Sequence, residues 1–317
     1  MKVRVLYHDH CFDGAASAAF VTRFLQAKFY PGAEFYYTGL AHRADQLFED
    51  SLFDGDVNAI VDFKYATHPN VTWWFDHHQS AFLSAEDAEH FRHDTSGRKL
   101  LDPSYRSCTK FIATVVKQDY GFEAPDLEEL VTWADIVDGA LYENAEAAVE
   151  MREPAMRLTL VIEGSKGPQL VQKVIRLMQR DCLEQIMCDP EILAEYNRLH
   201  KIHRHNIDII RTAGSCERGV IHFDLVEYGI EGYNKFIPYY LFPDSAYTVS
   251  VSTSTFRTKV SVGSNPWVRE PLQHNLASIC ERYGGGGHPK VGAISFPIGA
   301  VEEARKAAAE IREELKR

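Results

Sequence analysis

Acidic and imidazole side chains follow three separate apolar segments of the chain. In chain order these residues are His8, Asp9, Asp62, Asp76, His77 and His78. Carboxylate oxygens and imidazole nitrogens form mixed O/N ligand sets that suit divalent cations such as manganese. A carboxylate between two such cations can bridge them, an arrangement that promotes in-line displacement at phosphorus. The residue types therefore predict a centre for divalent cations, in which a carboxylate such as Asp62 could bridge two of them.

The apolar segments that precede these residues have the composition of buried parallel strands. They cover residues 3–7, 59–61 and 71–75 and are rich in Val, Ile and aromatic side chains. A helix is expected over 14–28 and a further strand over 34–38, an alternation typical of a parallel α/β domain. Because ligands bind beyond the carboxyl ends of the strands in such sheets, the three segments should deliver their side chains to one edge.

Helical patterns fill the middle of the chain, and strand patterns return after Gly214. The expected helices cover 107–119, 126–133 and the span 169–212, which is broken near 189–190. The later strands are expected over 219–226, 246–253 and 258–262, before a closing helix over 301–316. The sequence therefore predicts an α/β fold with a parallel-sheet catalytic domain over 1–188, a helical connector over 189–213 and a smaller α/β domain over 214–317.

The composition limits the partners and the setting of the protein. A formal net charge of −11 over 317 residues opposes tight binding to long double-stranded nucleic acid, which depends on neutralising many phosphates. No segment is apolar over a membrane-spanning length, and the N-terminal residues lack the pattern of a signal peptide, so a cytoplasmic protein is expected. The six cysteines form no CxxC pair, which favours reduced thiols over a disulfide framework.

Residues 8–17 concentrate ligand-type side chains at the junction of a strand and a helix. They read His-Asp-His-Cys-Phe-Asp-Gly-Ala-Ala-Ser. Several ligands within one turn can hold a single cation, whereas Asp13 taken alone would be explained equally well as a helix cap. The combination of this loop with Asp62 and the triplet at 76–78 favours the metal site.

The chain resembles the DHH phosphoesterases, which are named for the triplet found here at Asp76, His77 and His78. Residues 284–293, Gly-Gly-Gly-Gly-His-Pro-Lys-Val-Gly-Ala, are similar to the glycine-rich signature of the DHHA1 accessory domain. The signatures occur in the family's order and span residues 8–296. The resemblance implies hydrolysis at phosphorus, in the exopolyphosphatase-like or nanoRNase-like branch. It also implies two divalent cations, with Mn²⁺ expected and Mg²⁺ or Co²⁺ as alternatives.

The resemblance implies a role for each residue of the DHH domain. The expected metal ligands are His8, Asp13, Asp62, His77 and Asp135. His78 would face the phosphate and join Asp62 in catalysis, and Asp76 would orient a neighbouring histidine. Asp138 competes with Asp135 for the same ligand position.

The first motif departs from the family at one position. Many members carry two carboxylates two residues apart, whereas this chain has Cys11 two residues before Asp13. Asp9, His10 and Cys11 therefore remain alternative sources of the missing ligand.

The second domain is expected to bind the substrate. Consecutive glycines expose backbone N–H groups to a phosphate, and a guanidinium fork suits phosphate oxygens. The residues expected in this role are Arg257, Gly285, Gly286, Gly287 and His288.

Three functions compete at this point. The first is hydrolysis of phosphoester bonds in short oligonucleotides or nucleotides. The second is exopolyphosphatase or pyrophosphatase activity, favoured by the Cys-x-Asp-Gly loop, and the third is a sensor that binds a phosphorylated ligand without turnover. A homodimer remains open because aromatic residues such as Tyr239 and Phe242 could form a subunit interface.

Overall fold

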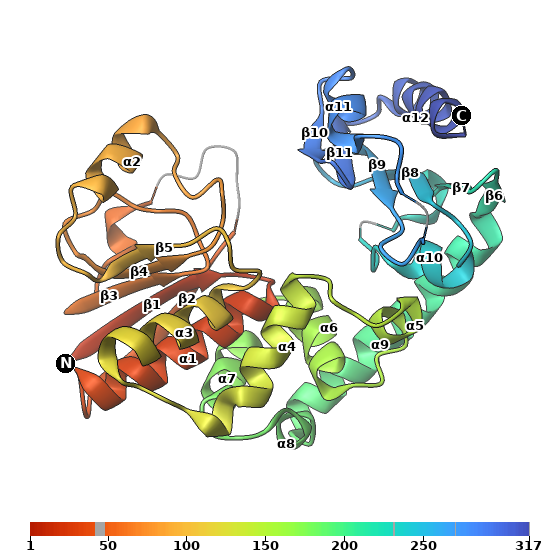
Figure 1. The fold of residues 1–317 in the computed structure, drawn as a ribbon. Coiled ribbons are helices and arrows are strands. Elements are labelled where there is room, and N and C mark those ends of the chain that lie inside the picture. Colours follow the sequence, from red (N-terminus) through yellow and green to blue (C-terminus); the bar gives the residue numbers. More distant parts are fainter. Residues whose placement is uncertain (42–47, 231, 270, 317) are drawn as a thin grey trace. The chain divides into compact units, whose positions relative to one another are not determined.

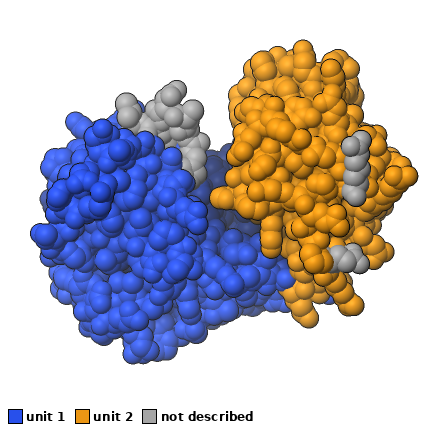
Figure 2. All heavy atoms as spheres, turned by 45° about the horizontal axis from the view of Figure 1, so that its top comes forward, with its two compact units in different colours: residues 1–142, 151–199 blue, residues 143–150, 200–317 orange. Residues whose placement is uncertain are grey.

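The structure is a computed structural model that describes residues 1–41, 48–230, 232–269 and 271–316. Contacts along the chain divide it into two units, which Figure 2 colours separately. Unit 1 comprises Met1–Tyr142 and Met151–Leu199, and unit 2 comprises Glu143–Glu150 and His200–Arg317. Each unit is built on its own β-sheet (Figure 1). Among the described residues, no helix combines the length and apolar character needed to cross a membrane.

The sheet of unit 1 consists of parallel strands in the order β2-β1-β3-β4-β5. In chain order the strands are β1 (Lys2–His8), β2 (Glu34–Leu40), β3 (Val57–Val61), β4 (Val71–Asp76) and β5 (Lys99–Leu101). Tyr7 pairs with Val61, and Val61 pairs with Phe75. The residues that follow these three positions therefore meet at one edge of the sheet. The prediction of a parallel α/β domain is confirmed.

Helix α1 (Phe12–Lys28) lies between the sheet and other helices, and Figure 1 shows α1 and α3 (Cys108–Tyr120) on the face opposite α2 (Ala85–Arg92). Most of α1 is buried, which explains its small and apolar composition. The helix begins two residues before the expected start at Gly14. A Cβ atom at Gly14 would lie 2.1 Å from the backbone oxygen of His8, so glycine is required where the helix begins against β1.

The remaining helices of unit 1 lie in the helical middle of the sequence, except for one that precedes β3. They are η1 (Asp50–Leu52), η2 (Pro125–Leu127), α4 (Glu128–Asp138), α6 (Pro154–Gly164), α7 (Pro168–Met178) and α8 (Leu183–Met187). Helix α1 contacts α3, α4, α6 and α7, so the apolar core on this side of the sheet is continuous. A separate core that includes Leu6, Ile60 and Trp74 lies on the opposite face.

Unit 2 contains a mixed sheet in the order β10-β11-β9-β8-β7-β6, in which β7 and β8 are parallel and the other pairs antiparallel. The strands are β6 (Ser215–Glu217), β7 (Val220–Asp224), β8 (Tyr247–Thr253), β9 (Thr258–Ser264), β10 (Gly286–His288) and β11 (Val291–Phe296). The helices are α5 (Ala145–Val149), η3 (Val226–Tyr228), α10 (Ile237–Leu241), α11 (Leu276–Glu281) and α12 (Val301–Leu315). The predicted second α/β domain is thus present, with part of the glycine run forming an edge strand.

The two faces of the second sheet differ in chemistry. Val249, Val251, Val260, Val262 and Ile294 are buried in a core with α11 and α12. The alternate positions on β8 and β9 are Ser250, Ser252, Lys259 and Ser261, so the opposite face is polar. Helix α9 (Pro190–Ala213) belongs to unit 1 as far as Leu199 and to unit 2 from His200.

Candidate metal centre

The carboxyl edge of the first sheet brings together side chains from the ends of five elements of unit 1. His8 ends β1, Asp62 follows β3, and His77 and His78 follow β4. Cys11 and Asp13 lie at the start of α1, and Asp138 is the last residue of α4. The potential ligand atoms form three groups, and within each group they lie within 4.8 Å of one another. The groups are His8, Cys11 and Asp62; Asp62, His77 and His78; and Asp13, His77 and Asp138.

Asp62 lies between two histidines, with each of its carboxylate oxygens toward a different ring. Its Oδ2 lies 3.3 Å from Nδ1 of His8, and its Oδ1 lies 3.3 Å from Nε2 of His77. The Asp62 side chain is only 1% exposed. This two-sided placement is the one that a carboxylate bridging two cations requires.

The backbone at Asp62 is held in an uncommon conformation. Its φ of 56° falls in the left-handed region, which aspartate tolerates better than most residues. The Asp62 N–H donates to the carbonyl of Phe75 at 2.9 Å, which ties the turn after β3 to β4. Local strain that the surroundings maintain is typical of functional sites.

The ring of His77 has the orientation of a metal ligand. Its Nδ1 lies 3.2 Å from the carbonyl of Tyr105, and an N–H at this position directs the Nε2 lone pair toward the carboxylates. Nε2 lies 3.3 Å from Asp62 Oδ1, 3.5 Å from Asp138 Oδ2 and 3.9 Å from Asp13 Oδ2. Nε2 and Asp62 Oδ1 are buried without a hydrogen bond. A divalent cation would satisfy these atoms, so the residues present fit the expected metal.

The pKa values of the carboxylates indicate that negative charge in this cluster is incompletely balanced. Burial, aided by the charges of Asp62 and Asp138, raises the pKa of Asp13 well above its usual value. Burial and Asp62 likewise raise the pKa of Asp138 to about 6. Burial opposes ionisation of Asp62 too, but its contacts with His77 and His8 hold its pKa below the usual value.

His77 carries positive charge among these carboxylates. Burial lowers its pKa, but the contact with Asp62 and the charges of Asp13, Asp62 and Asp138 outweigh burial and raise it to about 10. A protonated imidazole therefore balances part of the negative charge. A bound divalent cation would displace this proton and take over the same role.

Asp76 holds the second histidine of the triplet. Its Oδ1 accepts hydrogen bonds from the backbone N–H of His77 at 2.8 Å and of His78 at 3.3 Å. The same oxygen lies 2.7 Å from Nδ1 of His78. Burial lowers the pKa of His78, but the Asp76 contact and the charge of Asp62 raise it overall. Asp76 thus positions His78 and favours its protonated form.

Asp13 does not cap its own helix. It is a residue of the first turn of α1, and its carboxylate instead caps α3. Oδ2 accepts from the backbone N–H of Cys108 at 2.6 Å, and Oδ1 accepts from the backbone N–H of Thr109 at 3.0 Å and from its hydroxyl at 2.6 Å. These donors fix a fully buried carboxylate at the cluster.

Asp9, His10 and Asp135 lie outside the ligand groups formed by the described residues. Asp9 accepts from the backbone N–H of His10 at 3.0 Å, and its Oδ2 is 3.7 Å from the His10 ring. Asp135 accepts a hydrogen bond from the hydroxyl of Ser107 at 3.2 Å. The structure thus brings Asp138, rather than Asp135, to His77, and brings Cys11 to His8 and Asp62.

No family model matches the chain, and no curated protein matches its sequence. The chain is similar to the solved DHH domain of a member of the s1p family of ribosomal proteins. The match covers 99% of this chain and 87% of that chain, at 14% identity and a TM-score of 0.60. The pGpG-specific phosphodiesterase PggH from Vibrio cholerae matches 99% of both chains, at 19% identity and a TM-score of 0.70. This chain has the DHH phosphoesterase fold. The resemblance seen in the sequence is confirmed at the level of the fold.

RecJ from Thermus thermophilus, in complex with Mn²⁺, shares the DHH fold over 99% of this chain and 52% of its own. Its sequence identity is 13% and its TM-score is 0.59. This chain therefore spans about half of RecJ.

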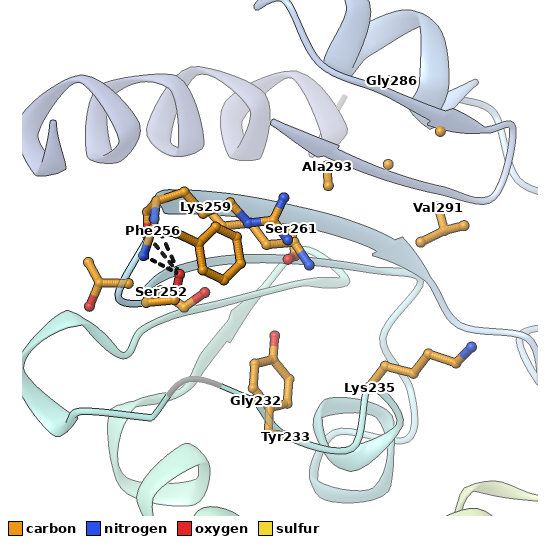
Figure 3. Close-up of a pocket in the computed structure, with 15 residues that line it drawn as sticks. Gly232, Tyr233, Lys235, Ser252, Phe256, Lys259, Ser261, Gly286, Val291 and Ala293 are labelled. Atoms are coloured by element: carbon orange, nitrogen blue, oxygen red, sulfur yellow. Dashed lines mark hydrogen bonds between the residues drawn. The ribbon is translucent and has the colours of Figure 1, made fainter. Parts of the chain in front are cut away.

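The sheet of unit 2 carries a pocket of about 680 Å³ on its polar face (Figure 3). Arg257, Gly286 and Gly287, all expected to bind substrate, line this pocket. Gly285 and His288 are not among its lining residues. A Cβ at Gly285 would lie 2.3 Å from the backbone oxygen of Ala293, so strand packing requires this glycine. Gly286, which pairs with Ala293, has open space at its Cβ position.

Further polar residues of the pocket were missed in the sequence. They are Tyr233, Lys235, Ser252, Thr253, Ser254, Lys259 and Ser261. Figure 3 shows Tyr233 and Lys235 coming from the segment before α10, while Lys259 and Ser261 come from β9. The signal available was the alternation of valine with serine or lysine along β8 and β9.

Lys259 and Arg257 are the two cationic side chains at β9, and each is affected by its surroundings in a different way. Burial lowers the pKa of Lys259, and the nearby charge of Arg257 lowers it further. A guanidinium nitrogen of Arg257 donates to the hydroxyl of Ser295 at 2.8 Å. An anion in the pocket would relieve the repulsion between the two cations.

Proposed function

We propose that this chain is a divalent-metal-dependent phosphohydrolase that cleaves phosphoester bonds in short nucleotides. The observation that carries the proposal is the placement of Asp62 between His8 and His77, with a buried carboxylate oxygen and a buried imidazole nitrogen that make no hydrogen bond. This arrangement supports a pair of cation positions that share one carboxylate.

The residues that would hold the two cations are His8, Asp13, Asp62, His77 and Asp138. Asp138 replaces Asp135 in this set because its carboxylate faces His77, whereas that of Asp135 contacts Ser107. The O/N donors around His77 suit Mn²⁺, with Mg²⁺ or Co²⁺ as alternatives. Bound cations would lower the pKa of water and neutralise charge at phosphorus.

His78 would act on the leaving group. Its side chain is 34% exposed, so a substrate can reach it, while Asp76 holds Nδ1. Because Asp76 favours the protonated ring, His78 is suited to donate a proton to the leaving oxygen or to stabilise negative charge in the transition state. Asp76 would keep the ring in place through this step.

The pocket of unit 2 would bind a phosphate of the substrate. Arg257 and Lys259 supply positive charge, the serines supply hydroxyl donors, and Gly286 has open space at its Cβ position. A small ligand fits a chain with a net charge of −11, which opposes binding to long nucleic acid. The structural similarity to a pGpG-specific phosphodiesterase favours a short nucleotide as the first substrate to test.

Hydrolysis of polyphosphate is the second candidate. Its support is the composition of the pocket, in which the hydroxyl and cationic groups would bind a phosphate chain without a base. A polyphosphate would be cut at a phosphoanhydride bond by the same metal centre.

The deciding experiment is a panel of substrates assayed with Mn²⁺ and with chelator. The panel contains pGpG, short RNA, 3'-phosphoadenosine phosphate and polyphosphate, each with wild type, Asp62→Asn and Asp135→Asn. Metal-dependent turnover of a nucleotide, lost in Asp62→Asn and retained in Asp135→Asn, would support the proposal. Turnover of polyphosphate alone would favour the second candidate, and tight ligand binding without any turnover would contradict both.

A further inference from the structure

Cys11 shares a ligand group with His8 and Asp62, but the function proposed above gives it no role. Its sulfur, a ring nitrogen of His8 and a carboxylate oxygen of Asp62 all lie within 4.8 Å of one another. Asp62 is almost fully buried, and its Oδ2 lies 3.3 Å from Nδ1 of His8. A thiol grouped with an imidazole and a buried carboxylate is placed to complete the coordination of a cation.

The backbone explains why Cys11 faces His8. His10 adopts a left-handed conformation with φ of 53°, which turns the chain between the end of β1 and the start of α1. The close approach of Gly14 to the His8 carbonyl holds the helix against the strand end. Cys11 is the N-cap residue of α1, but its side chain makes no capping hydrogen bond. The thiol is therefore not committed to capping the helix.

The other cysteines have different surroundings. The Cys108 sulfur contacts the carbonyl of Phe75 at 3.3 Å in the core, and Cys280 is also buried. Cys182, Cys188 and Cys216 are exposed. Among the residues that the structure describes, Cys11 is the one cysteine in a group of potential metal ligands.

We propose that the Cys11 thiolate is a ligand of the cation position formed with His8 and Asp62, and that this position selects a thiophilic cation such as Zn²⁺ or Co²⁺ over Mg²⁺. The inference rests on the proposed metal-dependent function. Sulfur and imidazole donors favour zinc and cobalt, whereas magnesium requires oxygen donors. The position around Asp13, His77 and Asp138 has only oxygen and nitrogen donors, so the two positions differ in the metal they prefer.

Metal binding at Cys11 has a simple proton balance. The S–H bond breaks, the proton passes to the buffer, and the sulfur electron pair forms the bond to the cation. The oxidation state of the metal and of the sulfur is unchanged. Binding at this position should therefore release one more proton in wild type than in a variant without the thiol.

The test is a titration of chelator-treated full-length protein with Co²⁺, followed by near-ultraviolet and visible absorption. Thiolate coordination produces a sulfur-to-cobalt charge-transfer band, while the visible bands report cobalt binding by any donors. The variants are Cys11→Ser, Cys11→Asp and, as a matched control, the exposed-cysteine variant Cys216→Ser. Circular dichroism verifies that each variant is folded.

We expect the charge-transfer band in wild type and Cys216→Ser, and its loss in Cys11→Ser, which retains Cys108. Cys11→Asp should bind two cations without the band and should bind Mg²⁺ more tightly than wild type. Visible cobalt bands without a charge-transfer band in wild type, or a band that persists in Cys11→Ser, would overturn the role of Cys11 while leaving the hydrolase intact. Failure of wild type to bind any divalent cation would overturn both proposals.

Discussion

Nε2 of His77 lies 3.3 Å from Oδ1 of Asp62, yet both atoms are buried without a hydrogen bond. Because neither atom makes a hydrogen bond, both can coordinate a cation once the imidazole loses its proton. The Asp62→Asn variant should therefore lose the bridging charge and bind metal weakly. Loss of a group that only holds a metal ligand typically costs roughly 10- to 100-fold. Asp62 would contact the cations itself, so we expect turnover to fall by roughly 100-fold or more.

Metal analysis and steady-state kinetics on Asp62→Asn test this role. Thermal unfolding of the metal-free variant serves as the control for folding. Wild-type turnover with two bound cations in Asp62→Asn would refute the bridging role.

Asp138 and Asp135 form a matched pair, since both lie on α4 and differ in what they contact. Asp138→Asn removes a carboxylate 3.5 Å from His77, and we expect weaker metal binding and turnover reduced by roughly 100-fold. Asp135→Asn should retain both properties because its carboxylate contacts Ser107. Equilibrium dialysis with Mn²⁺ and kinetics on the two variants measure the difference. The reverse order of effects would restore Asp135 as the ligand.

The uncertainty between these two aspartates shows what sequence patterns could not resolve. Residues three apart on a helix lie on the same side, so periodicity alone cannot choose between them. The choice depends on where α4 ends relative to β4, which is a tertiary property. By contrast, the strand ends that carry His8, Asp62 and His77 were predictable because each follows an apolar segment.

In the second unit, too, sequence patterns predicted the strands but not the residues that line the pocket. The serines and Lys259 alternate with valines, but this pattern indicates only a polar face and does not show that Tyr233 faces it. Helical periodicity also could not predict that α9 is divided between the two units. Such features depend on contacts between residues distant in the sequence.

The stability of the metal-free protein should depend on pH through His77. Its pKa rises from the ordinary 6.5 to about 10 in the folded state because of Asp62, Asp13 and Asp138, although burial opposes the rise. A raised folded pKa stabilises the protein fully below 6.5, and this contribution is lost as pH rises toward about 10. Urea unfolding of chelator-treated protein between these pH values should show a falling free energy of unfolding. His77→Gln should reduce the slope, and an unchanged slope would contradict the assignment.

Asp76 should act through His78 rather than through the metal. Asp76→Asn retains an oxygen that can accept the backbone N–H groups but removes the charge beside Nδ1 of His78. We expect kcat to fall roughly 10- to 100-fold while the number of bound cations stays unchanged. The pH profile of kcat should also shift to lower pH on its basic limb, because the pKa of His78 falls. Loss of metal in this variant would show that Asp76 supports the ligands directly.

Arg257 and Lys259 should determine substrate affinity. Both line the pocket of unit 2, so Arg257→Ala or Lys259→Ala should remove a charge-assisted contact to phosphate. Such contacts contribute about 1.5–3 kcal/mol, which corresponds to a rise in KM of roughly 10- to 100-fold. The cations of unit 1 should remain bound, because neither residue belongs to that centre. Lys290→Ala is the matched control, since Lys290 is exposed and is not among the pocket residues. An equal rise in KM for Lys290→Ala would indicate general electrostatic attraction, whereas an effect confined to Arg257 and Lys259 would identify the polar face of this sheet as the phosphate-binding surface.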